Sequence, residues 1–154
     1  MKFRPLHAVV LVVLVLGGGL AVERAMGGRQ RFERVGPDAD AKVVIDLAGF
    51  DRDEVRFYRF LNAGNQEVRF LVGKDAAGAI QVAFDASEND FKMNRGFRAG
   101  DGWVVNNKCD SSFRLTEINS QPSGCAPVPV KFARDGDRLV LAEDALLAGW
   151  RFFR

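Results

Sequence analysis

Histidine is almost absent from this sequence. Its 154 residues include one, His7, which lies ahead of an apolar N-terminal run. The rest of the chain therefore lacks imidazole, the commonest general base and the commonest metal ligand. This excludes Ser-His-Asp and Cys-His catalysis from the folded domain, together with metal sites that depend on histidine. Because no motif of another enzyme class is present, we predict that the protein is not an enzyme.

An excess of charge of one sign is also lacking. Lys and Arg number 22 against 20 Asp and Glu, a formal net charge of +2. No run of basic residues alternates with aromatic residues, so we expect no binding to nucleic acid. The chain is 47% hydrophobic and has no low-complexity tract, which suffices for the core of one modest domain with an N-terminal addition.

Long apolar runs are confined to the N-terminus. Residues 1–4 include two basic side chains, residues 8–16 are wholly aliphatic, and small residues end at Ala21. This order is typical of a secretory signal peptide. An uncleaved membrane anchor is the alternative, although the run falls short of the ~20 residues that a span needs. We assign residues 1–27, with their hydrophobic helix, to a signal peptide or membrane anchor. Either assignment predicts a protein of the bacterial cell envelope, periplasmic or anchored in the inner membrane.

The remaining chain divides into a polar tether, residues 28–41, and a mainly-β domain, residues 42–154. Alternating apolar residues predict three or four antiparallel strands in a meander, with turns at residues 62–65 and 75–78. These strands cover Val43 to Leu47, Glu54 to Leu61, Val68 to Val72 and Ile80 to Phe84. Shorter strands are predicted at 103–105, 113–115, 130–133 and 138–141, the last two joined by a tight turn at Asp135-Gly136. One short C-terminal helix is expected at 142–148, so the fold class is mainly β (α+β).

Residues 83–127 hold both cysteines and resemble a known family. The matching segments are Ala83-Phe84-Asp85-Ala86, Gly96-Phe97, Asn106-Asn107-x-Cys109 and Gly124-Cys125-x-Pro127. They are similar to a bacterial family called domain of unknown function 2318, whose members are described as predicted membrane proteins containing iron and sulfur. The resemblance extends over residues 43–153. It implies an envelope domain that in relatives holds a metal or cluster and serves an iron-uptake or export-type membrane system, with a metal permease as partner.

The family signature has two C-x-x-C pairs and a later Gly-Cys-x-Pro, and this sequence departs from it. Ser87 and Asp90 stand where the first pair would have its cysteines, and Asn106 replaces the first cysteine of the second pair. Only Cys109 and Cys125 keep their places. Because an iron–sulfur cluster normally needs four thiolates, the sequence predicts that the family site has degenerated.

The two cysteines leave several alternatives open. Cys109 and Cys125 could form a disulfide, which suits an exported chain and would stabilise it by about 3 kcal/mol. They could instead join Asp90 and Asp110 in holding a single zinc, iron or copper ion. They do not form a C-x-x-C pair, which argues against a redox-catalytic role.

Two functions follow from these alternatives. The first is an envelope accessory or interaction domain, attached to the membrane through its N-terminal segment, with no cofactor. The second is a metal-binding or electron-transfer domain that works with a metal transport system through a reduced set of ligands.

Overall fold

The computed structural model describes residues 31–119 and 124–154. The predicted signal peptide or anchor at residues 1–27 lies outside the described residues. Among the residues described, no helix is both long and apolar enough to cross a membrane.

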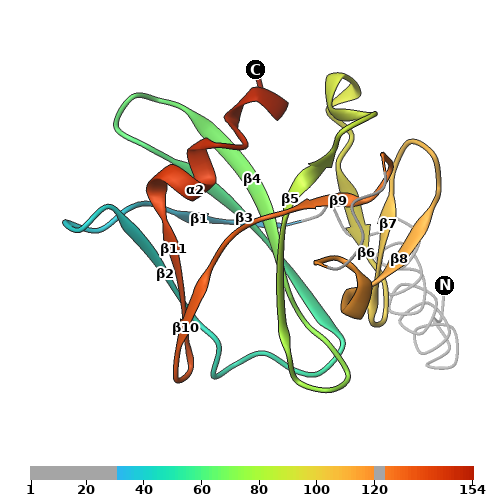
Figure 1. The fold of residues 1–154 in the computed structure, drawn as a ribbon, viewed down its shortest axis with the longest axis horizontal. Coiled ribbons are helices and arrows are strands. Elements are labelled where there is room, and N and C mark those ends of the chain that lie inside the picture. The colour runs from blue at the N-terminus through green and yellow to red at the C-terminus, as the bar shows by residue number, and fades with distance from the viewer. Residues whose placement is uncertain (1–30, 120–123) are drawn as a thin grey trace, which may run out of the picture. The chain divides into compact units, whose positions relative to one another are not determined.

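The centre of the fold is a five-stranded sheet in the order β1-β3-β4-β5-β9 (Figure 1). Three of its strands, β3 (Glu54–Leu61), β4 (Glu67–Lys74) and β5 (Ile80–Ser87), form the predicted antiparallel meander. The first turn closes with a bond from the N–H of Asn65 to the carbonyl of Asn62 (3.1 Å), and the second with one from Gly78 to Asp75 (2.8 Å). Both turns lie where the sequence predicted them.

Two three-stranded sheets lie beside the central one. In the first, β11 (Arg138–Ala142) pairs with β10 (Ala133–Asp135) and β2 (Lys42–Asp46), and the short helix α2 (Glu143–Leu147) follows it. The second contains β6 (Phe97–Ala99), β7 (Trp103–Asn106) and β8 (Ser112–Arg114). The mainly-β class with one short C-terminal helix is confirmed.

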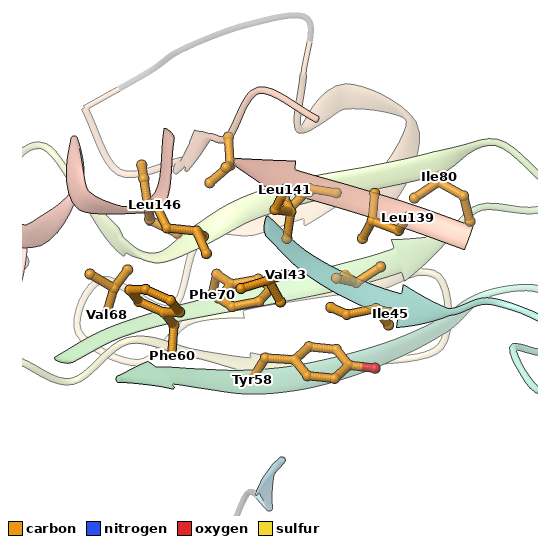
Figure 2. Packing of buried hydrophobic residues seen from close by; sticks show 14 of the residues in the cluster. Val43, Ile45, Tyr58, Phe60, Val68, Phe70, Ile80, Leu139, Leu141 and Leu146 are labelled. Carbon is orange, nitrogen blue, oxygen red and sulfur yellow. The ribbon is translucent and has the colours of Figure 1, made fainter. Parts of the chain in front are cut away.

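Each face of the central sheet packs on its own hydrophobic cluster. Figure 2 shows the larger cluster, in which Tyr58 and Phe70 face Ile45 of β2 and Leu141 of β11. The smaller cluster includes Leu71, Phe97 and Leu115. All eight residues of β5 are buried, as expected for a strand covered on both faces.

Alternation along β5 decides which side chains reach the candidate site. Val82, Phe84 and Ala86 belong to the larger cluster, whereas Ala83 belongs to the smaller one. Since side chains of a strand alternate between its two faces, Asp85 and Ser87 share the face of Ala83. Two buried polar residues are thus placed against the β6–β8 sheet.

The structure corrects two strand assignments at the start of the domain. Residues 32–35, assigned to the tether, form β1 (Phe32–Val35), which pairs in parallel with β3. Glu33 and Arg34 made this segment look polar, but Phe32 packs edge-on against Phe57, with ring centroids 5.8 Å apart. The strand around Val43 and Ile45 pairs with β11 rather than joining the meander.

Two further differences concern the later strands. Residues 130–132 of the strand predicted at 130–133 lie between two strands, β9 (Pro127–Pro129), which pairs with β5, and β10, which begins at Ala133. The prolines concealed β9, because proline cannot donate to a sheet and is tolerated only at edges such as this one. The tight turn at Asp135-Gly136 is confirmed.

Candidate functional site

Three separate segments converge at one end of β5. Ser87 ends β5 and Asp90 follows it, Asn106 ends β7 with Cys109 in the next turn, and Cys125 precedes β9. The N–H of Asn89 donates to the carbonyl of Gly124 (2.9 Å), which ties the first segment to the third.

Three metal-ligating side chains meet at this point. One carboxylate oxygen of Asp90 and the sulfurs of Cys109 and Cys125 all lie within 4.8 Å of one another. Asp90 is buried, Cys125 is half-buried and Cys109 is exposed. An ion at about 2.3 Å from each sulfur joins thiolates up to about 4.6 Å apart, so small side-chain movements suffice for one ion. The sequence predicted all three of these residues.

Asp110, the other predicted ligand, does not join this group. Its backbone has a positive φ of 53°, and its carboxylate accepts a bond from Nη2 of Arg98 (3.0 Å) at the surface. The Asp110 side chain is 79% exposed. Among the described residues, the group of side chains that could hold a metal ion is therefore two thiols and one carboxylate, without Asp110.

Asn106 is hydrogen-bonded to residues of all three segments of the site, a role that the sequence did not reveal. It is 2% exposed. Its Nδ2 donates to the carbonyl of Cys125 (3.0 Å) and lies 3.3 Å from Oδ2 of Asp90 and 3.4 Å from Oγ of Ser87. Its Oδ1 accepts the N–H groups of Lys108 (2.9 Å) and Cys109 (3.4 Å). One amide thus holds all three segments together, where the resemblance implied only a lost thiol.

Lys108 provides the positive charge of the site. Its Nζ lies 2.7 Å from Oδ1 of Asp90. This hydrogen bond is the main reason why the pKa of Asp90 is lowered and that of Lys108 is raised. No motif marks Lys108 in the sequence, and its adjacency to Cys109 is the only signal that could have found it.

The two sulfurs differ in their surroundings, although both are free thiols. Desolvation acts to raise the pKa of Cys109, but hydrogen bonds with Ser111 and Cys125 together outweigh it, so the pKa is lowered. The Sγ–Oγ distance between Cys109 and Ser111 is 3.3 Å. The contact with Cys109 raises the pKa of Cys125. The predicted disulfide is not formed in this structure and stays a prediction.

Asp85 lies deeper, on the same face of β5. It is 3% exposed, and its Oδ1 accepts the N–H of Phe97 (2.7 Å). Burial raises its pKa to about 6, against the opposing effects of the Phe97 bond and the charge of Arg69. Asp85, Ser87, Asp90 and Asn106 line a small cavity of about 10 Å³, room for about one water molecule.

A family comparison matches most of the domain. Residues 50–153 match the family described as "Membrane iron-sulfur containing protein FtrD-like". The chain belongs to the FtrD-like family. The description of this family agrees with the membrane and iron–sulfur terms that the resemblance implied for relatives, although the matching family carries a different name. Neither the curated proteins nor the solved structures contain a match.

The site of this FtrD-like chain does not fit an iron–sulfur cluster. Clusters are held by four thiolates, and the sequence contains two cysteines in all. Ser87, Asp90 and Asn106, at the positions of the missing thiols, are hydrogen-bonded to one another around a cavity for about one water molecule. The remaining donors suit one metal ion.

Proposed function

We propose that this FtrD-like domain is an accessory domain of a metal-handling system in the bacterial cell envelope, and that it binds one metal ion at Cys109 and Cys125 beside Asp90. The observation that carries the proposal is the convergence of the three ligand atoms within 4.8 Å. They come from three segments that are far apart in sequence. The hydrogen bonds of Asn106 hold these segments in place.

The donor types decide which ions suit the site. Thiolates favour zinc, copper(I) and iron, whereas a site for magnesium or calcium is built from oxygen ligands. Two thiolates and one carboxylate leave a coordination position for water or for a ligand from another protein. Such a position suits an accessory domain that receives an ion from, or passes it to, a membrane permease. The proposed role is therefore binding rather than catalysis.

Metal titration of the full-length chain tests this proposal. The reduced, metal-stripped protein is titrated separately with Zn²⁺, Fe²⁺ and Cu⁺, and we expect one ion of at least one of these metals per chain. Cys109→Ser and Cys125→Ser should each weaken its binding by at least about 100-fold, because loss of a direct ligand should cost at least as much as the 10- to 100-fold typical of an outer-shell partner. Ser112→Ala, an exposed change on β8 that leaves both thiols in place, is the control and should keep the affinity and the stoichiometry. Wild-type protein that binds none of the three ions would refute the proposal.

One observation favours a second candidate, an interaction domain without metal. Both oxygens of Asp90 already have protein partners, Lys108 at 2.7 Å and Asn106 at 3.3 Å. The buried carboxylate therefore needs no ion to be stable. A folded chain that stays metal-free in all three titrations is the result that this candidate predicts.

A further inference from the structure

Cys109 and Cys125 have the arrangement of an attacking and a resolving thiol. The sequence separates them by 16 positions, so spacing alone indicates no redox pair. The fold brings their sulfurs within 4.8 Å of each other. We propose that Cys109 is a reactive thiol that exchanges with small disulfides and that Cys125 resolves the product into an intramolecular disulfide.

Exposure and hydrogen bonding distinguish the two thiols. Cys109 is exposed in the turn after β7, where a bulky oxidant can reach it, whereas Cys125 is half-buried. The Oγ of Ser111 lies 3.3 Å from the Cys109 sulfur and can donate to the thiolate, which is the nucleophile in exchange. Cys109 is therefore the first of the two to react.

The exchange takes place in two balanced steps. The Cys109 thiolate attacks one sulfur of a small disulfide such as oxidised glutathione. The S–S bond breaks, one glutathione leaves as a thiolate, and a mixed disulfide forms on Cys109. Cys125 loses its proton and attacks the Cys109 sulfur, which releases the second glutathione. Two electrons pass from the protein dithiol to the oxidant, and the two protein protons neutralise the departing thiolates.

Disulfide formation consumes both thiolates that the metal would use. A metal-loaded dithiolate and an oxidised disulfide are therefore mutually exclusive states of one site. This second half of the inference rests on the proposed function, while the exchange reaction does not. The site would release its ion when the surroundings become oxidising.

Intact-mass measurement on the metal-stripped, full-length chain tests the exchange. Wild-type protein treated with oxidised glutathione should lose two hydrogens and retain no adduct. Cys125→Ser should accumulate one glutathione adduct, because no resolving thiol remains. Cys109→Ser should react about 10-fold more slowly than Cys125→Ser, since its remaining thiol is less exposed. A wild-type chain that keeps both thiols, or two variants that react equally fast, would overturn the proposal.

Metal titration of the oxidised chain tests the coupling separately. Affinity for the ion bound by the reduced chain should fall about 100-fold after oxidation and return after reduction. Equal affinities of the two forms would overturn the coupling. If the reduced chain binds no ion while the disulfide still forms, the proposed function fails and the exchange reaction stands.

Discussion

Replacing Gly96 with alanine is expected to lower the free energy of unfolding by about 2 to 5 kcal/mol. Gly96 has a φ of 60°, a left-handed conformation that costs an L-residue about 1–2 kcal/mol. In addition, a Cβ at this position would overlap both carboxylate oxygens of Asp85. Those oxygens cannot move freely, because Asp85 is buried and bonded to the N–H of Phe97. Overpacking of this kind typically costs about 1–3 kcal/mol more.

Gly136→Ala is the matched control for this measurement. Gly136 has nearly the same φ, 59°, but a Cβ there would meet no atom within 4 Å. We therefore expect Gly136→Ala to lower the free energy of unfolding only by the cost of the left-handed backbone conformation, about 1–2 kcal/mol. Denaturant unfolding of both variants separates the two contributions. Equal losses would show that Asp85 does not lie against Gly96.

Asp85→Asn is expected to stabilise the protein near neutral pH by up to about 3 kcal/mol. The folded-state pKa of Asp85, about 6, lies above the usual value of this group. The contribution of a carboxyl with a raised pKa is fully present below the unfolded-state pKa and is lost as pH rises through the folded-state value. At pH values above about 6 the wild-type protein must keep a buried charge that asparagine does not carry. Raising the pKa of this carboxyl from 3.8 to about 6 corresponds to about 3 kcal/mol.

The test of this prediction is how the stabilisation by Asp85→Asn changes between two pH values. Unfolding free energies of wild-type and Asp85→Asn proteins are compared at about pH 3, below the unfolded-state pKa of Asp85, and at about pH 7.5, above its folded-state pKa. Their difference should be small at the lower pH and large at the higher one. The lowered pKa of Asp90 has the opposite effect on the pH dependence of stability, but Asp90 is present in both proteins, so its contribution cancels in the comparison. The nearby Arg69 and Arg95 are also present in both proteins. Ser87→Ala, an uncharged change on the same face of β5, should show no such pH dependence.

Local sequence patterns predicted the central meander well, because its strands are neighbours both in the sequence and in the sheet. Strands β3, β4 and β5 follow one another with short turns, and their apolar residues alternate clearly. Pairing between distant segments was the part that could not be predicted. The alternation of Val43 and Ile45 marks a strand, but nothing in it says whether β3 or β11 is the partner.

The candidate site shows the same division. Cys109, Cys125 and Asp90 were predicted because thiols and carboxylates have recognisable chemistry. The roles of Asn106 and Lys108 depend on contacts across three segments, which no local pattern carries. Asp110 was misplaced for a related reason, because residue type cannot show that its carboxylate faces Arg98.

We propose above that this FtrD-like site holds one ion between two thiols rather than an iron–sulfur cluster. Total metal and acid-labile sulfide, measured per chain on full-length protein purified without oxygen, test that claim most directly. We predict one metal ion per chain and no labile sulfide. Several irons per chain with a matching amount of sulfide would contradict it.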